Sequence, residues 1–245
     1  MENFRSVFTW VFTVVFLGLM FPVTCIIWFA GYPFDRYGKL VHRFLLFQGR
    51  TLTRATPLWK FKIEGTEKIR KGQAYVIICN HQSVLDIILL NNIRTDFRWI
   101  SKAENFRVPI LGQSMRMAGY ISIQRGNKDS SIQMHEKALK VLSRNTSIMM
   151  FPEGTRSQSR KLLPFKLGAF HLALNSDKPI LPVVIDGTGA VLPKHGYRFR
   201  SGHILRVSIL DPVFPGAFGT GDAAGLAEKF SNLISEELEK LRTSS

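Results

Sequence analysis

The sequence predicts an α/β protein: a mixed sheet covered by helices, preceded by an N-terminal membrane-associated helical segment. Two observations predict this architecture. From about residue 60, short runs of β-branched and other apolar residues alternate with helical stretches, as in sheets covered on both faces. Before that point, an uncharged run extends from Ser6 to Phe34. We therefore divide the chain into N-terminal membrane-associated helices, residues 1–57, and a domain that carries the sheet, residues 58–245.

The uncharged run contains an apolar stretch, residues 7–30, long enough for a membrane helix, which needs roughly 20 such residues. Trp10 and Trp28 stand near its ends, where aromatic side chains favour the membrane interface. A cleavable signal peptide would be shorter and would end in small residues, whereas this stretch ends in bulky ones. Pro22 removes a backbone donor within it, so a spanning helix and a helix that enters one leaflet and returns both stay open.

Basic residues recur at helical spacing directly after the apolar stretch, at Arg36, Lys39, Arg43, Arg50 and Arg54. At about 100° per residue they fall on one face of a helix, within roughly 60°. This pattern predicts a basic amphipathic helix over 36–56 that lies on an anionic membrane surface, the alternative being an ordinary solvated helix face. Because positive charge follows membrane helices on the cytoplasmic side, we expect the sheet domain to be cytoplasmic.

The elements of the sheet domain are predicted from their apolar periodicity. Strands are expected at Ala74–Cys79, Arg98–Ser101, Tyr120–Ile123, Ser147–Phe151, Ile180–Ile185 and Ile204–Leu210, which are short apolar runs bounded by polar residues. Helices are expected at Ser83–Asn91, Ser130–Ser143, Leu167–Asn175 and Ala223–Leu241.

The charge of the chain indicates an anionic partner. Its 33 Lys and Arg against 18 Asp and Glu give a net charge of +15, all of it beyond residue 34. Nucleic acid, phosphorylated metabolites and acidic lipid are the candidate partners, but no nucleic-acid-binding motif is present, so we expect no nucleic acid. The two cysteines, Cys25 and Cys79, exclude a disulfide framework and a four-cysteine zinc site, and we expect no metal.

Reactive side chains follow the first predicted strand, in the stretch Asn80–Asp86. His81 and Asp86 are five positions apart, which on one regular helix would point them about 140° apart. They meet only if His81 lies in the turn and Asp86 in the first helical turn. One interpretation is a capping box between Ser83 and Asp86, and the other is a carboxylate-oriented imidazole that takes a proton from a hydroxyl. The spacing alone leaves both open.

Two further strands end in groups that suit an anion. Arg125 closes Gly119–Arg125, although a lone arginine at a strand end is typical of a solvated residue. In Phe151–Ser157 a Gly-Thr-Arg turn offers backbone donors, a hydroxyl and a guanidinium, which together suit a phosphate. Glu153 beside Arg156 also fits an ion pair that stiffens the turn. No glycine pattern of a nucleotide cradle is present.

These stretches resemble the four sequence blocks of the glycerolipid acyltransferases. NHQSVLD matches Asn-His-x4-Asp, GYISIQR matches Gly-x3-Ile-x-Arg, FPEGTRS matches the third block, and the apolar run around Pro182 matches the fourth. The third block, the apolar N-terminus and Pro164–Phe170 resemble the bacterial 1-acyl-sn-glycerol-3-phosphate acyltransferases in particular. Gln124, often an acidic position, and Leu167, often a polar one, depart from the pattern.

The resemblance implies a fold like that of glycerol-3-phosphate acyltransferase and a specific reaction. A fatty acyl group passes from a thioester of acyl carrier protein or coenzyme A to the 2-hydroxyl of 1-acyl-sn-glycerol 3-phosphate (lysophosphatidate), giving phosphatidic acid in phospholipid synthesis. His81 is the implied general base and Asp86 orients it, with no cofactor beyond the acyl donor. The implied location is the cytoplasmic side of the bacterial inner membrane, with anionic membrane lipid as a partner.

The resemblance also implies which residues bind the phosphate and glycerol of the acceptor: Arg125, Glu153, Gly154, Thr155 and Arg156. We add Lys102 and Lys166 as a further basic wall, although both also fit solvated lysines. Three alternatives stay open. An acyltransferase for another lysophospholipid or a lyso-ornithine lipid would share the blocks. A membrane-anchored hydrolase would use the His-Asp pair on water, but its usual Gly-x-Ser-x-Gly elbow is missing. An anionic-lipid-binding module would need only the basic face.

Overall fold

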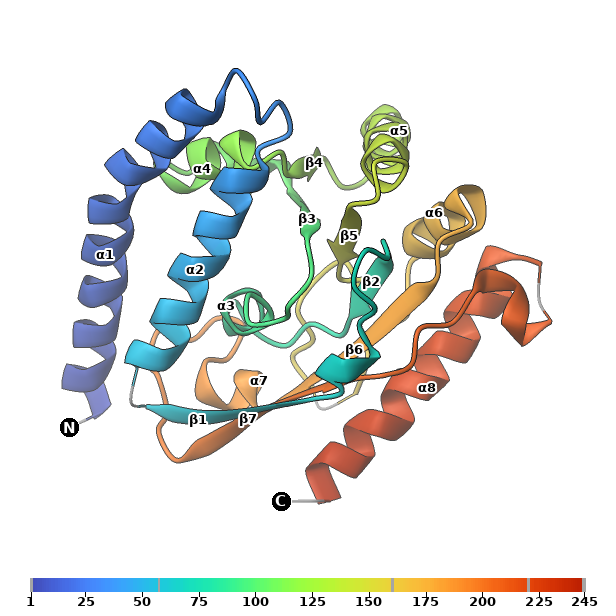
Figure 1. Ribbon diagram of the computed structural model, residues 1–245. Helices are drawn as coiled ribbons and strands as arrows, with labels where there is room; N and C mark the ends of the chain where they lie inside the picture. Colours follow the sequence, from blue (N-terminus) through green and yellow to red (C-terminus); the bar gives the residue numbers. More distant parts are fainter. Residues whose placement is uncertain (1, 57, 160, 220, 244–245) are drawn as a thin grey trace.

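A seven-stranded mixed sheet lies at the centre of the computed structural model, which describes residues 2–56, 58–159, 161–219 and 221–243 (Figure 1). Its strands are β1 (Trp59–Glu64), β2 (Val76–Cys79), β3 (Phe97–Lys102), β4 (Ile121–Ile123), β5 (Ser147–Met150), β6 (Ile180–Asp186) and β7 (His203–Ile209). They lie in the order β1-β7-β6-β2-β5-β3-β4. Neighbours are parallel except β6 and β7, so the predicted mixed α/β sheet is confirmed.

Six of these strands were predicted, with ends shifted by at most two residues, and β1 was missed. The sequence Trp59–Glu64 alternates apolar residues with charged ones, and its side chains alternate between half-buried and exposed. The strand pairs with β7 at the edge of the sheet, where one face of a strand stays in contact with water. A search for continuously apolar runs therefore passes over it.

The helices cover both faces of the sheet. They are α1 (Glu2–Gly31), α2 (Lys39–Ala55), α3 (Leu85–Leu90), α4 (Leu111–Met117), α5 (Lys128–Leu142), α6 (Gly168–Ser176), α7 (Thr188–Val191) and α8 (Ala223–Thr243). The predicted helices of the sheet domain correspond to α3, α5, α6 and α8, whereas α4 and α7 were not predicted. Both of these are short, with seven and four residues, and leave little periodicity to detect.

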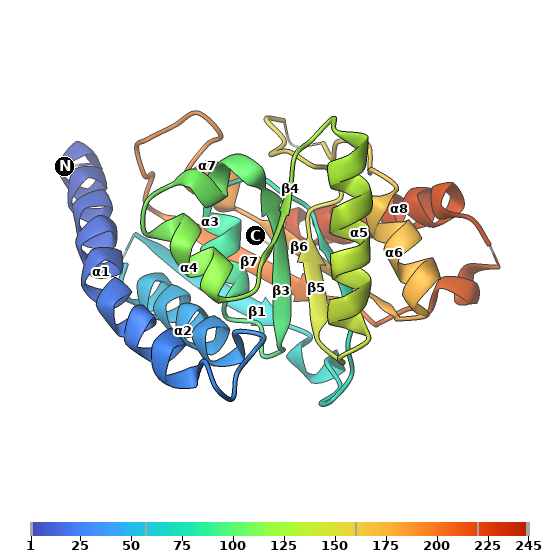
Figure 2. The same cartoon turned by 90° about the horizontal axis from the view of Figure 1, so that it is seen from above.

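Alternating side chains of the central strand β2 point into two separate cores. Ile77 and Cys79 pack with residues of α2, α3 and α7, and Val76 and Ile78 pack with residues of α5, α6 and α8. Figure 2 shows these two groups of helices on opposite sides of the sheet. Each such fully buried aliphatic side chain contributes about 1.5–3 kcal/mol, so β2 and the loop that follows it are firmly held.

Helix α1 runs unbroken through Pro22 and packs against α2 and α4. Near its start, the Phe199 amide donates to Ser6 Oγ at 2.9 Å and Trp10 Nε1 donates to the Tyr197 carbonyl at 2.8 Å. Its outer face is an exposed apolar stripe that includes Phe4, Val7, Phe8, Val11, Val14, Val15, Leu19, Ile26 and Phe29. Within the described residues it is the one helix long and apolar enough to cross a membrane.

Helix α2 begins at Lys39, so the predicted start at residue 36 is wrong. The Asp35 carboxylate accepts hydrogen bonds from the amides of Lys39 and Leu40 at 2.9 and 2.6 Å, which caps the helix there. Arg36 therefore lies in the turn before the helix, outside the predicted basic face. Arg50 also leaves that face, since its Nε donates to the Asn91 carbonyl at 2.9 Å. The domain boundary predicted after residue 57 falls on a residue outside the described ones.

Candidate active site

His81 and Asp86 meet at the carboxyl end of β2. His81 lies in the loop after the strand and Asp86 in the first turn of α3, as their spacing requires. His81 Nδ1 lies 2.8 Å from Asp86 Oδ2. Because a carboxylate oxygen accepts, we assign the ring proton to Nδ1, which leaves Nε2 as the basic nitrogen. No hydrogen bond engages Nε2 within the described part of the chain.

The Asp86 carboxylate is fully buried and four donors satisfy it. Oδ2 also accepts from the amides of Gln82 and Ser83, at 2.7 and 2.9 Å, and Oδ1 accepts from the hydroxyl of Thr188. The bond from Ser83 is half of the predicted capping box. One carboxylate therefore holds the backbone before α3 and also orients the imidazole, and the proton transfer to His81 stays a prediction.

Ser83 does not cap α3 as predicted, because the helix begins two residues later, at Leu85. Ser83 Oγ donates to the Leu192 carbonyl at 2.7 Å and accepts from the Leu85 amide at 3.3 Å. The hydroxyl thus ties the loop after β2 to the segment that follows α7. This tether limits how far the His81 loop can move.

The loop after β5 holds His81 from the other side. The His81 amide donates to Glu153 Oε1 at 2.7 Å, and the Ser157 amide donates to the His81 carbonyl at 2.8 Å. The ring of Phe151 stacks on the imidazole with centroids 3.8 Å apart and planes 9° apart. Backbone and ring of His81 are therefore fixed together, while 13% of its side chain stays exposed.

Glu153 is buried, and both of its carboxylate oxygens are engaged. Oε1 accepts from His81, and Oε2 accepts from the Leu163 amide at 2.9 Å. Burial raises the pKa of this carboxyl to about 7, although both backbone bonds favour the charged form. Both oxygens bond to the protein itself, so the visible contacts of Glu153 brace the loop. Its predicted role in acceptor binding stays a prediction.

The other predicted site residues lie at the same edge of the sheet. Because β2, β5, β3 and β4 are successive parallel neighbours, their carboxyl ends are adjacent. His81 follows β2, the turn Gly154–Arg156 follows β5, Lys102 ends β3 and Arg125 follows β4. Thr155 and Arg156 are half-buried and Arg125 is exposed. The fold therefore places the predicted basic groups in a row that starts beside the imidazole.

The two lysines of the predicted basic wall have different surroundings. Lys166 lies over Gly154, where a Cβ atom would come within 3.0 Å of its Nζ, and the Gly154 φ of +70° also favours glycine. This ammonium therefore adjoins the Gly-Thr-Arg turn. Lys102 forms an exposed ion pair with Glu104 at 3.0 Å. Nothing in these contacts directs Lys102 toward the turn.

Two residues that position the dyad, Thr188 and Phe151, were not predicted from the sequence. Thr188 comes two residues after β6, whose carboxyl end is next to that of β2. Like His81, Thr188 is a polar residue just after a buried strand, and this signal could have identified it. Phe151 stood inside a recognised block but carried no chemical signal. Cys79, by contrast, is buried as expected, and burial raises the pKa of its thiol, which makes it inert packing.

A histidine–carboxylate dyad and basic turns at the carboxyl ends of the strands of an α/β sheet are an arrangement suited to group transfer onto a hydroxyl. A family profile described as Acyltransferase matches residues 60–186, more than half of the 245 residues. This chain belongs to that acyltransferase family.

Named relatives point to one activity within the family. The chain is 30% identical over 202 residues to a chloroplast 1-acyl-sn-glycerol-3-phosphate acyltransferase of Brassica napus, covering 80% of this chain and 58% of that protein. It is 34% identical over 185 residues to the enzyme of the same name from Saccharomyces cerevisiae, covering 74% and 60%. The chain thus spans less than two thirds of these relatives' length.

A solved structure shares the fold over nearly the whole chain. It is the crystal structure of the 1-acyl-sn-glycerophosphate (LPA) acyltransferase from Thermotoga maritima, with a TM-score of 0.76 and 24% identity, covering 99% of this chain and 98% of that one. The likeness therefore includes the N-terminal helices as well as the sheet domain.

Proposed function

We propose that this protein transfers a fatty acyl group from a thioester to the 2-hydroxyl of 1-acyl-sn-glycerol 3-phosphate, giving phosphatidic acid. The observation that carries the proposal is the position of the His81–Asp86 dyad. Its free ring nitrogen and the Gly-Thr-Arg turn both lie at the carboxyl ends of neighbouring parallel strands. The turn offers donors that suit a phosphate. The names of the relatives from Brassica napus and Saccharomyces cerevisiae support this substrate.

In the proposed mechanism His81 acts as general base. Nε2 takes the proton of the acceptor hydroxyl while the hydroxyl oxygen forms a bond to the carbonyl carbon of the thioester. The carbon–sulfur bond then breaks, the ester remains, and the leaving sulfur takes the proton back from His81. Asp86 stabilises the imidazolium formed between these steps and fixes the tautomer. A thiol has a pKa near 8.5, so its departure needs little help, and the proposal requires no acyl-enzyme and no cofactor.

The acceptor phosphate is proposed to bind Arg125 and the turn Gly154–Arg156, with Lys166 beside it. Guanidinium groups bind phosphate with two parallel hydrogen bonds, and the backbone of the turn adds donors. These groups act on a charge remote from the reacting hydroxyl. They therefore orient the acceptor and set its affinity rather than take part in the proton transfer.

We propose that the enzyme works at a membrane surface, with the sheet domain on the cytoplasmic side of a bacterial inner membrane. The exposed apolar stripe of α1 provides the surface for lipid contact, and the basic residues of α2 that remain exposed, Arg43 and Arg54, favour anionic headgroups. Either acyl carrier protein or coenzyme A fits as carrier of the acyl thioester.

A thioester-release assay with the purified full chain tests the function. Acyl-coenzyme A and acyl carrier protein thioesters are each offered with lysophosphatidate, glycerol 3-phosphate, a lyso-ornithine lipid or no acceptor. We expect release that depends on lysophosphatidate and phosphatidic acid as the lipid product. Release that depends on another acceptor would reassign the substrate, and free fatty acid without any acceptor would indicate a hydrolase.

A further inference from the structure

A cavity of about 540 Å³ lies beside the turn that joins α1 and α2. Arg98 and Thr146 line it and stand at the starts of β3 and β5, whereas His81 and Glu153 follow the ends of β2 and β5. Because these strands are parallel, the cavity lies at their amino ends and the candidate active site lies at their carboxyl ends. Its volume falls in the usual range for small-molecule sites, roughly 300–1,000 Å³.

The lining of this cavity is strongly basic. It carries five cationic side chains and one acidic one, namely Arg36, Lys39, Arg98, Arg116, Arg144 and Asp35. The Asp35 carboxylate caps the amides at the start of α2, and its single negative charge can offset only one of the five positive charges. The lining therefore keeps a surplus of positive charge.

Two of the cations donate hydrogen bonds within the protein, and the other three have no carboxylate partner among the described residues. Arg98 donates to the Asp96 carboxylate at 2.8 Å, and Arg116 donates to the Phe106 carbonyl at 2.5 Å. Among the described residues, no carboxylate pairs with the other three, which are Arg36, Lys39 and Arg144. Arginines placed together without a carboxylate form the donor set that recognises phosphate.

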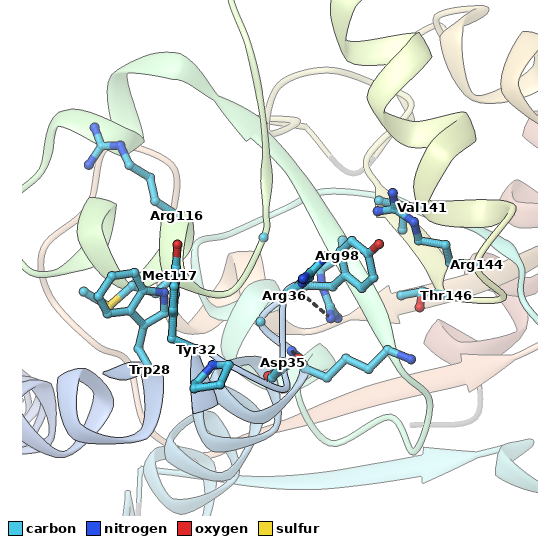
Figure 3. Close-up of a pocket in the computed structure, with 15 residues that line it drawn as sticks. Trp28, Tyr32, Asp35, Arg36, Arg98, Arg116, Met117, Val141, Arg144 and Thr146 are labelled. Carbon is cyan, nitrogen blue, oxygen red and sulfur yellow. Dashed lines mark hydrogen bonds between the residues drawn. The ribbon is translucent and has the colours of Figure 1, made fainter. Parts of the chain in front are cut away.

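The other end of the cavity is apolar and aromatic. Figure 3 shows Trp28, Tyr32 and Met117 grouped on one side of the cavity, with Arg98 and Arg144 on the other. Trp28 lies near the end of α1, whose outer face is the exposed apolar stripe. Tryptophan and tyrosine at the end of an apolar helix mark the depth of lipid headgroups in a membrane. The cavity thus combines an anion-binding end with a wall suited to the glycerol and upper acyl region.

We infer that this cavity binds the phosphate group of an anionic phospholipid, at a site separate from the acceptor site. Arg36 and Arg144 hold the phosphate, and Lys39 adds charge at the start of α2. The inference does not depend on the proposed acyl transfer. The cavity lies at the opposite ends of the strands from His81, and the inferred event is the binding of a lipid with no reaction.

Calorimetric titration of the full chain in neutral detergent tests this site. The starting protein carries Arg125→Ala and Arg156→Ala, which removes the proposed acceptor-phosphate contacts. The probes are short-chain phosphatidylglycerol, short-chain phosphatidylcholine and inorganic phosphate. We expect saturable binding of phosphatidylglycerol, and Arg36→Gln with Arg144→Gln should raise its Kd about tenfold or more. Lys128→Gln with Lys137→Gln, exposed on α5 and outside the cavity lining, is the matched control and should keep the Kd within about twofold.

The probes separate the possible sources of the phosphate. Binding of inorganic phosphate that depends on Arg36 and Arg144 would support the site and assign it to free phosphate as well. An unchanged Kd in the Arg36/Arg144 variant, equal losses in both double variants, or no saturable binding would overturn the inference. Arg144 also stacks on Tyr37, with its guanidinium 3.8 Å from the ring centroid. Should the double variant misfold, Lys39→Gln is expected to raise the Kd severalfold without disturbing that stack.

Discussion

The hydroxyl of Thr188 donates a hydrogen bond to Asp86 Oδ1, on the side of the carboxylate away from His81. Thr188 is fully buried at the start of α7 and reaches Asp86 across the adjacent carboxyl ends of β6 and β2. The carboxylate that orients the imidazole is therefore itself fixed by a neighbouring strand. The orientation of His81 Nε2 therefore depends on the hydrogen bonds that link Thr188, Asp86 and His81.

Replacing Thr188 by valine is expected to reduce kcat roughly tenfold with little change in KM. Valine has nearly the same shape but no hydroxyl, so Asp86 Oδ1 loses its donor and the carboxylate is free to rotate. Thr188→Ser keeps the hydroxyl and should recover most of the activity. Steady-state kinetics with lysophosphatidate measure both, and equal rates for the valine and serine variants would argue against a positioning role.

Glu153→Gln is expected to lower kcat by about ten- to a hundredfold. One amide oxygen replaces two carboxylate oxygens, so either the His81 amide or the Leu163 amide loses its acceptor and the His81 loop loosens. The buried unpaired N–H should also cost about 1–3 kcal/mol in the free energy of unfolding. Kinetics and urea unfolding are compared with Glu136→Gln, an exposed position on α5 where neither quantity should change.

Arg125→Ala and Arg156→Ala are each expected to raise the KM for lysophosphatidate about tenfold and to leave kcat within about threefold. Both groups are proposed to bind the phosphate, which lies away from the reacting hydroxyl. Monoacylglycerol, which lacks the phosphate, is the matched acceptor: variants and wild type should use it equally poorly. A fall in kcat alone would show that these arginines take part in the chemical step.

His42 is expected to make the free energy of unfolding pH-dependent. It is buried between α2 and the sheet, with Nδ1 3.0 Å from the Tyr120 hydroxyl. Burial and the charges of Arg98, Arg50 and Arg43 hold its pKa well below the ordinary value. Asp96 lies 3.7 Å from Nε2, but its carboxylate is already paired with Arg98 at 2.8 Å. The folded protein therefore keeps His42 neutral under mildly acidic conditions.

The unfolded chain binds a proton at His42 below about pH 6.5 and the folded chain does not, so the free energy of unfolding falls as the pH decreases. Between pH 7.5 and 5.5 this group should contribute a loss on the order of 1 kcal/mol. His42→Asn, which keeps a polar atom near Nδ1, should lose that part of the pH dependence. Urea unfolding at the two pH values measures it, and identical pH dependence in variant and wild type would contradict the assignment.

The sequence alone predicted most of the sheet because its central strands β6, β2 and β5 are rich in apolar residues. It also specified the one arrangement in which His81 and Asp86 can meet, across a strand–helix turn, and left open whether they do. The edge strand β1 and the start of α2 escaped prediction for physical reasons. Alternating charge conceals an edge strand, and the capping bond from Asp35 sets where the helix begins.

Contacts between distant segments were beyond the reach of sequence patterns. Thr188 lies 102 positions from Asp86, and Glu153 lies 72 positions from His81. A motif shows which residue types are present, but not which of their atoms are already bonded within the protein. For that reason Glu153 was assigned to the acceptor site, while its contacts in the structure are with the backbone.

The central claim, that His81 is the general base, is tested most directly by the turnover of His81→Ala. The assay follows phosphatidic acid formed from lysophosphatidate and an acyl thioester at saturating concentrations, with vesicle binding as the control for folding and membrane attachment. The account predicts a kcat at least about a hundredfold below that of the wild type, with vesicle binding unchanged. A variant that binds vesicles and turns over at close to the wild-type rate would contradict it.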